Sequence, residues 1–280
     1  MRAFVLSGGA NYGAQQVGAL EALFQRGLAP DMLVGVSAGA LNAAWIAQHP
    51  TLEGVRELAR IWREEATEFI PAVRPLNVGL RLLRGKDSLL PAGPLLRFLR
   101  RWSFADGTFG DLTGPRLYVI AARLIDGGLR VFGDSPADRL LDGLMSSTAM
   151  PPFYPPWEVD GVPYLDGGVI SHLPLQVAVA RGATEIFALR IGPGPAPHNN
   201  GATPRTMLSI GGQAISLLID RQARLEIEAV RREPGVQLHL IHLYLDDDPG
   251  LWNFTRADEL MAAGRRLAEA YLDNRVASHA

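Results

Sequence analysis

The segment Gly35-Val36-Ser37-Ala38-Gly39 has the residue types of a serine nucleophile held on a sharp turn. It follows the apolar run 32–34, which predicts a buried strand, and precedes 40–47, which predicts a helix. A serine hydroxyl attacks poorly unless such a strand-to-helix turn exposes its oxygen, and small neighbours avoid clashes there. Because the chain has 30 glycines, the same residues also fit an ordinary glycine-rich turn with a helix-capping serine. The motif therefore needs support from elsewhere in the chain.

A glycine-rich turn near the start of the chain could bind an anion. The apolar residues 2–6 predict a strand, residues 7–13 (Ser-Gly-Gly-Ala-Asn-Tyr-Gly) a turn, and residues 14–26 an amphipathic helix. Backbone N–H groups at the start of a helix are unpaired and carry partial positive charge. They can cradle a phosphate or stabilise the oxyanion of a tetrahedral intermediate.

The segment Asp166-Gly167-Gly168 could supply a base. It follows a predicted hairpin, in which 157–159 turns at Asp160-Gly161 into 162–165. An aspartate before two glycines at the end of a strand is most often part of a turn. Beside a serine nucleophile, the same carboxylate becomes a candidate general base.

In this order along the chain, the motifs resemble those of the patatin-like phospholipase family. The resemblance extends over roughly residues 2–190 and includes 147–151 and 153–155, which look like the segment before the family's aspartate. It implies a Ser-Asp dyad without histidine, in which Ser37 is the nucleophile and Asp166 the base. It further implies an oxyanion hole made by the N–H groups of Gly8, Gly9 and Ala10. The supporting glycines of the motifs are Gly13, Gly35, Gly39, Gly167 and Gly168.

The chain departs from the family pattern at three positions. Ala10 stands where the family usually has a third glycine, which is harmless unless the residue needs a positive φ. Tyr12 replaces an Arg or Lys, and its lack of charge weakens the expectation of a preference for charged headgroups. His172 stands where the family tends to carry Asn, and we interpret it as a hydrogen-bonding substitute.

Composition favours one soluble, cytoplasmic catalytic domain over residues 1–280, because no linker divides the chain. The chain has no cysteine, which excludes disulfides and thiolate catalysis. We expect no metal, no cofactor and no nucleic-acid partner. His239 and His242 make a poor metal site, because their rings would point to opposite faces of a strand. Residues 3–6 are too short for a signal-peptide core, and no stretch has the apolar length of a bilayer span. The high arginine, alanine and glycine content suggests a bacterial coding sequence.

Strand and helix patterns alternate along the chain, which predicts an α/β fold with a mostly parallel central sheet and helices on both faces. For the family resembled, this is a three-layer sandwich. The motifs fall at the carboxyl ends of predicted strands, where α/β proteins place their sites. Further predicted elements are a helix at 51–69, a hairpin of 117–122 with 129–132, a helix at 136–145, a helix at 175–180, a strand at 185–191, a long helix to about 232, a strand at 236–243 and a helix at 257–274.

Residues 70–104 form an irregular, basic insertion in this pattern. The segment carries seven basic residues and one acid, a net +6 in a chain of formal charge −2, with leucines and Trp102 between them. Such a stretch can lie on an anionic membrane surface, giving a peripheral membrane contact, or form a lid over a lipid-binding cleft. It can also be an ordinary set of surface helices. The apolar residues 207–219 predict core packing or an acyl pocket, and Glu64-Glu65 and 246–248 predict solvated faces.

The function that these observations favour is a serine lipid acyl hydrolase of phospholipase A, lysophospholipase or esterase type, acting on a lipid or ester substrate. An α/β-hydrolase carboxylesterase with a histidine base is an alternative, although that fold has several strands before its nucleophile and this chain has one. A second alternative is a non-catalytic phosphate- or nucleotide-binding protein that uses the Gly8–Gly13 loop. It lacks a Walker-type Gly-Lys-Ser/Thr and a well-placed ribose-binding acid.

Overall fold

The computed structural model describes residues 1–66, 81, 83–102, 106–192, 206–245, 250 and 253–277, with only the backbone at 207–209 and 276–277. Its centre is an eight-stranded sheet in the order β5-β6-β3-β2-β1-β7-β8, with β4 paired to β3. The strands are β1 (Arg2–Leu6), β2 (Met32–Gly35), β3 (Arg116–Arg123), β4 (Leu129–Phe132), β5 (Trp157–Val159), β6 (Val162–Asp166), β7 (Glu185–Ile191) and β8 (Gln237–Leu243).

The sheet is mixed, and its larger part is parallel. Strands β3, β2, β1, β7 and β8 run in one direction, whereas β4 and β6 are antiparallel to β3 and β5 is antiparallel to β6. β1 is covered on both faces, and its residues 3–6 are fully buried. This explains why its sequence is a continuous apolar run rather than an alternating one.

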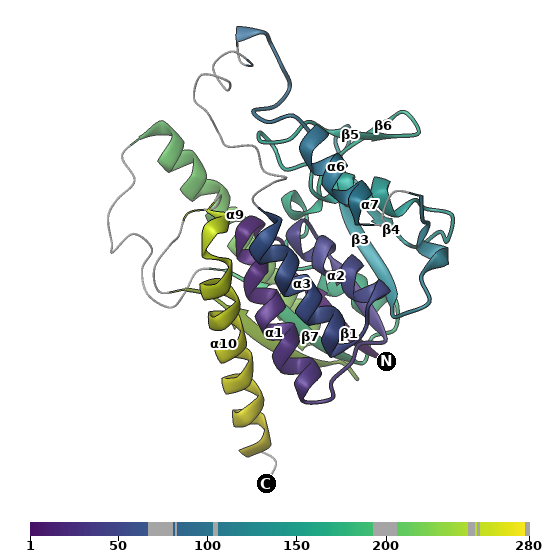
Figure 1. Cartoon of the computed structure of the whole chain (residues 1–280), viewed down its shortest axis with the longest axis vertical. Coiled ribbons are helices and arrows are strands. Elements are labelled where there is room, and N and C mark those ends of the chain that lie inside the picture. The colour runs from purple at the N-terminus through teal and green to yellow at the C-terminus, as the bar shows by residue number, and fades with distance from the viewer. Residues whose placement is uncertain are drawn as a thin grey trace.

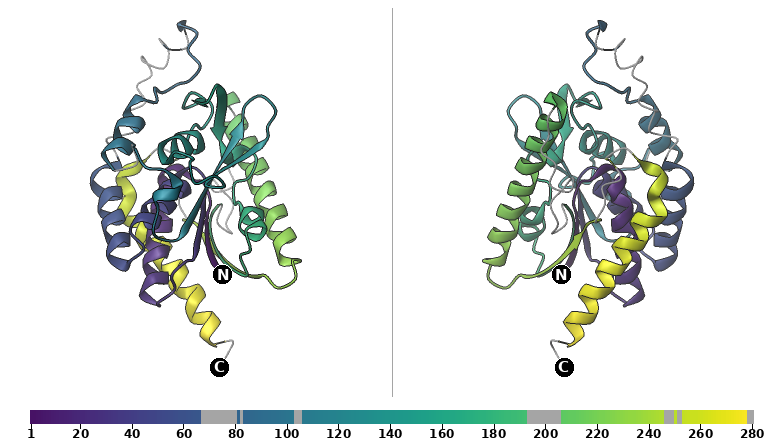
Figure 2. Two further views of the ribbon diagram at one scale, coloured as in Figure 1. Left: turned by 90° about the vertical axis from the view of Figure 1, so that its right-hand side faces the viewer. Right: turned by 90° about the vertical axis from the view of Figure 1, so that its left-hand side faces the viewer.

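Helices cover both faces of the sheet and complete a three-layer sandwich (Figures 1 and 2). One face packs against α1 (Gly13–Gln25), α2 (Ala38–Gln48), α3 (Leu52–Glu64), α7 (Leu140–Ser147) and α10 (Ala257–Ala277), with α6 (Gly93–Arg101) outside them. The other face packs against α8 (Leu175–Ala180) and α9 (Met207–Arg231). Successive residues of β1 alternate between the two cores, as Phe4 and Leu6 join the first and Ala3 and Val5 the second.

Helices α1 and α10 cross at very short range. A Cβ on Gly18 would lie 1.9 Å from the carbonyl oxygen of Met261, and a Cβ on Gly264 would lie 1.9 Å from that of Gln15. Glycine at both positions lets the two backbones approach directly. The closing helix is thereby fixed against the helix that follows the glycine-rich turn.

Most predicted elements are present, with shifted ends. The helix expected at 51–69 begins at Leu52 and ends at Glu64, and residues 67–69 lie outside the described part. The helix expected at 136–145 begins only at Leu140, because Ser135–Asp138 form a turn in which the Asp138 N–H donates to the Ser135 carbonyl. Of the insertion expected at 70–104, the described residues include the regular helix α6. The acidic run 246–248 lies outside the described residues.

Four apolar side chains on the first half of α9 do not pack in the core. Ile210, Ile215, Leu217 and Leu218 are each more than half exposed. Among the described side chains of this helix, the core contacts lie further along, at Ala223, Ile227 and Val230. The expectation of core packing was wrong, because helical periodicity shows that a stripe exists but not what covers it.

Within the described residues, no helix combines the length and the hydropathy that crossing a bilayer requires.

Candidate active site

Ser37 lies on the turn between β2 and α2, with φ of 55° and ψ of −127°. A non-glycine residue rarely adopts this backbone conformation, and such strain is common at catalytic nucleophiles. The turn is possible only without neighbouring side chains, since a Cβ on Gly35 would lie 2.6 Å from the Gly39 carbonyl oxygen. A Cβ on Gly39 would lie 2.5 Å from the carbonyl oxygens of Leu6 and Ser7. The N–H of Ser37 donates to the hydroxyl of Ser147 at 2.9 Å.

Asp166 is the last residue of β6 and is 4% exposed. Its Oδ1 accepts a hydrogen bond from the N–H of Gly168 at 2.8 Å, and its own N–H donates to the Ala149 carbonyl. The hydroxyl of Ser37 also lies beside this carboxylate and acts to lower its pKa. Burial nevertheless raises the pKa of Asp166 to about 6, against the opposing effects of the Ser37 hydroxyl and the Gly168 N–H. Such a pKa suits a base that works near neutral pH.

We expected the backbone N–H groups of Gly8, Gly9 and Ala10 to stabilise an oxyanion, but in the structure they differ in whether a protein acceptor already occupies them. The N–H of Gly8 donates to the carbonyl of His172 at 3.3 Å. Within the described part of the chain, the N–H groups of Gly9 and Ala10 donate to no protein acceptor. These two groups are thus the ones available to a substrate oxygen.

Ala10 has a φ of 46°. This is the left-handed region in which a Cβ is unfavourable, so the departure from the family's glycine carries a conformational cost. Gly9 leaves no room for a side chain, because a Cβ there would lie 2.8 Å from the side chain of Ile191. Tyr12 ends the short 3-10 turn Ala10–Tyr12, and its N–H donates to the Gly9 carbonyl at 2.9 Å.

A buried polar network supports the glycine-rich turn, and the sequence analysis missed it. The side chain of Gln16 donates to the carbonyls of Ser7 and Leu189, and that of Asn42 donates to the Gly13 carbonyl and to Gln16. The indole N–H of Trp62 donates to Asn42 at 2.9 Å. The available signal was amide side chains within otherwise apolar helices, since a buried amide must find partners.

The ring of His172 lies beside the site, but within the described residues no hydrogen bond joins it to Ser37. A Cβ on Gly8 would lie 3.2 Å from its ring, and a Cβ on Gly168 would lie 3.6 Å from its Nδ1, so the ring packs against both turns. Desolvation lowers the pKa of His172 to about 4, against an opposing effect of the Ile191 backbone. The histidine is therefore neutral near pH 7.

Helix α9 holds the segment that follows the aspartate. The N–H of His172 donates to the Gln222 side chain at 3.1 Å, while the Ser171 hydroxyl and the Leu175 N–H both donate to Glu226. The carboxylate of Glu226 thus caps the start of α8. Burial raises the pKa of Glu226.

The other two histidines singled out in the sequence belong to β8. His239 stacks on Phe187 and hydrogen-bonds Tyr271, whereas His242 lies near Arg190 and Asp220 toward α9. Their rings face opposite sides of the sheet. Neither forms a recorded hydrogen bond with Ser37 or Asp166.

The profile of the patatin-like phospholipase family matches residues 4–179. Patatin-like phospholipase domain-containing protein 7 of Rattus norvegicus is 30% identical over 191 residues, which are 68% of this chain and 13% of that protein. Neuropathy target esterase sws of Drosophila melanogaster is 30% identical over 193 residues, 67% of this chain and 13% of that protein. The match thus spans a small part of these curated relatives.

Two solved structures share the fold. VipD from Legionella pneumophila has a TM-score of 0.51 at 15% identity, over 96% of this chain and 67% of that one. A chain of the SpcU–ExoU complex from the type III secretion system of Pseudomonas aeruginosa has a TM-score of 0.51 at 16% identity, over 98% and 52% of the two chains.

Proposed function

Because the chain belongs to the patatin-like phospholipase family, we propose that it is a serine lipid acyl hydrolase that uses Ser37 and Asp166 as a catalytic dyad. The observation that carries the proposal is the position of the Ser37 hydroxyl, on its strained turn, beside the buried carboxylate of Asp166, whose pKa it acts to lower. This position places a nucleophile next to a base of suitable pKa with no third residue between them.

In the proposed reaction, the oxygen of Ser37 attacks the carbonyl carbon of an acyl ester while its proton passes to Asp166. The carbonyl oxygen becomes an oxyanion, which the N–H groups of Gly9 and Ala10 stabilise by hydrogen bonds. When the intermediate collapses, the alcohol leaves with the proton from Asp166 and the acyl group stays on Ser37. A water molecule then gives a proton to Asp166 and attacks the acyl carbonyl. As the carboxylic acid leaves, Asp166 passes this proton to the oxygen of Ser37, which restores the serine and the carboxylate.

The alternatives fit the structure less well. A histidine-dependent esterase needs a basic ring bonded to Ser37, whereas desolvation lowers the pKa of His172 to about 4 and no hydrogen bond joins its ring to Ser37 within the described residues. A phosphate-binding role for the Gly8–Gly13 turn would not explain why a serine on a strained turn lies beside a buried carboxylate of raised pKa. No observation favours either alternative over a hydrolase with a Ser-Asp dyad.

The substrate class that we propose is a phospholipid, lysophospholipid or other lipid ester, and the proposed location is cytoplasmic with peripheral membrane contact. An arginine-rich composition is also consistent with the proposed bacterial source. The support for membrane contact is charge: Arg97 and Arg100 are exposed on α6, within a segment of net charge +6. Arg101 contributes less to the positive charge available to a membrane, because its guanidinium forms an ion pair with Glu65 at 2.7 Å.

Membrane contact is tested by co-sedimentation with anionic vesicles. Each basic residue near the surface contributes about 1 kcal/mol, so Arg97→Glu with Arg100→Glu should weaken binding strongly, and rising salt should weaken wild-type binding. The matched control is Arg231→Glu with Arg232→Glu, at the far end of α9. Equal sedimentation of all three proteins would show that α6 makes no electrostatic contact with the membrane.

Hydrolysis is tested on a panel of lipid esters with Ser37→Ala, Asp166→Asn and the double variant. Each single change should lower turnover by at least about 10³-fold, and the double change should be no worse, because residues of one catalytic unit fail together. Ser216→Ala and Asp160→Asn, on exposed sites, are the matched controls and should keep full activity. If the double variant were much slower than either single variant, the two residues would not form a dyad.

A further inference from the structure

The glycine-rich turn keeps its shape against backbone strain. Ala10 has a φ of 46°, and a strained conformation persists only where the surrounding structure fixes it. The N–H groups of Gly9 and Ala10 donate to no protein acceptor within the described residues, so they add nothing to this fixation. A donor in an oxyanion hole must lie about 2.7–3.1 Å from the oxygen. The contacts that fix the turn therefore also decide whether it can stabilise an oxyanion.

Two buried amide side chains fix the turn at both ends. Gln16 of α1 donates from its Nε2 to the Ser7 carbonyl at 2.8 Å and to the Leu189 carbonyl of β7 at 3.3 Å. Asn42 of α2 donates from its Nδ2 to the Gly13 carbonyl at 2.9 Å and to the Gln16 Oε1 at 3.0 Å. Both side chains are fully buried. The turn thus lies between two carbonyls that this pair of amides holds.

Trp62 sets the direction of these bonds. Its indole N–H donates to the Asn42 Oδ1 at 2.9 Å, and an indole N–H can only donate. The amide oxygen of Asn42 must therefore face Trp62, which turns its NH2 group toward its two acceptors. Because one of these acceptors is the oxygen of Gln16, the NH2 group of Gln16 faces its own pair of carbonyls. We call this directed chain, from Trp62 through Asn42 to Gln16, the amide relay.

The amide relay connects the turn to the helix that carries the nucleophile. Asn42 lies on α2, which Ser37 directly precedes. At the start of the turn, a Cβ on Gly8 would lie 3.3 Å from the Ser37 Cβ. At its end, a Cβ on Gly13 would lie 2.9 Å from the Ala38 side chain. The turn and the start of α2 are therefore in close contact at both places, and the relay holds them there.

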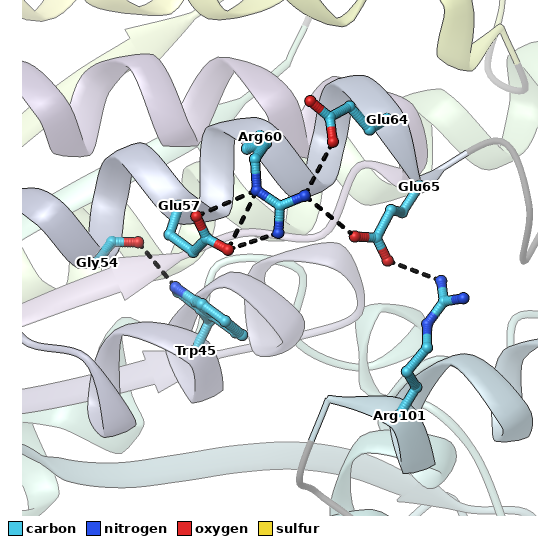
Figure 3. Close-up of polar contacts among 7 residues, drawn as sticks. All are labelled: Trp45, Gly54, Glu57, Arg60, Glu64, Glu65 and Arg101. Carbon is cyan, nitrogen blue, oxygen red and sulfur yellow. Dashed lines mark hydrogen bonds and ion pairs between the residues drawn. The ribbon is translucent and has the colours of Figure 1, made fainter.

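Helix α3, where the relay begins, is itself fixed to α2 and to α6 (Figure 3). The Trp45 indole N–H of α2 donates to the Gly54 carbonyl at 2.8 Å. Arg101 of α6 pairs with Glu65 at 2.7 Å. Arg60 lies 3.6 Å from the same carboxylate and pairs with two further glutamates of α3. Glu65 was expected on a solvated face, yet its side chain is only 16% exposed.

We propose that Gln16 and Asn42 are positioning residues, which hold the free N–H groups of the glycine-rich turn at a fixed distance from the oxygen of Ser37. The proposal rests on the proposed hydrolase function and adds the residues that set the geometry of its oxyanion hole. Neither amide touches a reacting atom, so each acts through the turn. Because the oxyanion exists only after attack, loss of the relay should lower kcat far more than it raises KM.

The first test measures the turn itself and needs no turnover. The N–H of Gly8 bonds the His172 carbonyl, and that of Tyr12 bonds the Gly9 carbonyl. Hydrogen exchange at these two sites, followed by NMR, therefore reports how firmly the turn is held. Gln16→Met removes the amide and keeps a side chain of similar length, and it should speed exchange at both sites by about tenfold.

Gln15→Met is the matched control. Gln15 is the preceding residue of α1 and is equally buried, yet its amide has no hydrogen-bond partner within the described residues. Its replacement should leave both exchange rates unchanged. Equal exchange rates in wild type and in Gln16→Met would show that the relay does not hold the turn, and would overturn the proposal.

The second test measures the oxyanion hole with a trifluoromethyl ketone and the methyl ketone of the same chain. On the fluorinated ketone, Ser37 adds its oxygen to the carbonyl carbon and gives its proton to Asp166, which leaves an oxyanion in the hole. The methyl ketone binds without this bond, so the ratio of the two inhibition constants reports oxyanion stabilisation, whereas a general loss of packing weakens both ketones alike.

Gln16→Met should lower the preference for the trifluoromethyl ketone by at least about tenfold, since removal of one oxyanion donor costs about 10²–10³-fold in kcat. KM for the ester and the pH midpoint of kcat/KM should stay as in wild type, because Asp166 is not part of the relay. Gln15→Met should keep the full preference.

Trp62→Phe is a milder variant, because it keeps an aromatic ring and removes only the indole N–H that orients Asn42. It should lower the same preference by about threefold or more. Trp157→Phe, which removes an indole N–H bonded to Asp142, is its control and should change nothing. Full preference in folded Gln16→Met and Trp62→Phe proteins would overturn the positioning role. A wild-type protein without this preference would instead refute the hydrolase function on which the proposal rests.

Discussion

The hydroxyl of Ser37 lies beside the carboxylate of Asp166, although a strand that belongs to neither residue separates their strands. Ser37 follows β2 and Asp166 ends β6, and β3 lies between these strands. Gly35, two residues before Ser37, pairs with Val119, and Asp166 pairs with Ala121. Ser37 is two residues beyond Gly35, and Ala121 is two residues beyond Val119, so Ser37 and Asp166 lie at the same level along the sheet. The meeting depends on the register of β6, which pairs only with the last three residues of β3, so that its final residue lies beside Ala121, near the carboxyl end of β3.

The pH dependence of hydrolysis should follow the ionisation of Asp166. A general base must be deprotonated, and burial raises the pKa of Asp166 to about 6. We expect kcat/KM for a soluble ester to rise through about pH 6 and to stay level from about pH 7 to 8.5. A midpoint near 4 would mean that Asp166 is not desolvated in the working enzyme.

The same carboxylate should lower the stability of the folded protein at neutral pH. Because its pKa is raised on folding, its favourable contribution is complete below the unfolded pKa of about 3.9 and is lost as pH rises through about 6. Asp166→Asn should therefore gain about 3 kcal/mol relative to wild type between pH 4 and pH 8. Urea unfolding at the two pH values measures this, with exposed Asp160→Asn as the control. A gain that is the same at both pH values would contradict the raised pKa.

Replacing the histidines should leave most of the activity. His172 is a weak base, because desolvation lowers its pKa to about 4, and no hydrogen bond joins its ring to Ser37 within the described residues. We expect His172→Asn, His239→Ala and His242→Ala each to retain turnover within about tenfold, whereas loss of a general base costs about 10²–10⁴-fold. Steady-state kinetics on folded variants decide this. A loss in His172→Asn as large as that in Ser37→Ala would favour a triad.

Glycine at position 10 should stabilise the protein, although glycine usually destabilises. Ala10 has a φ of 46°, and a Cβ in this region costs about 1–2 kcal/mol. We expect Ala10→Gly to raise the free energy of unfolding by up to about 1 kcal/mol, since the unfolded chain gains some freedom as well. Ala14→Gly, in the helix that follows, should instead lower it by about 1 kcal/mol. If both variants lost stability equally, Ala10 would not be strained.

Local patterns predicted the elements and motifs well, because each lies within a few consecutive residues. The apolar runs before Ser37 and the glycine-rich turn, and the hairpin before Asp166, were legible because buried strands and tight turns have short sequence signals. The predicted ends of the strands agree with the structure more closely than the predicted start of the helix at 136–145. In the structure a turn takes the place of that helix's first residues.

Contacts between distant segments could not be predicted from the sequence. The N–H of Gly8 was expected to be free, but the carbonyl of His172, far along the chain, occupies it. Glu65 was read as a solvated acid because its partner Arg101 belongs to another helix. The conformation of Ala10 likewise depends on the turn as a whole. A side chain's partner is set by tertiary structure, which residue type and spacing do not specify.

The most direct test of the dyad is labelling by a fluorophosphonate, followed by peptide mass spectrometry. The reagent phosphonylates a serine only when a base activates its hydroxyl. Wild-type protein should gain a single adduct on Ser37, Ser37→Ala should gain none, and Asp166→Asn should react at least about 10³-fold more slowly. A folded wild-type protein that takes up no label, or that carries it on Ser146 or Ser147 instead, would contradict the assignment of Ser37 as the nucleophile.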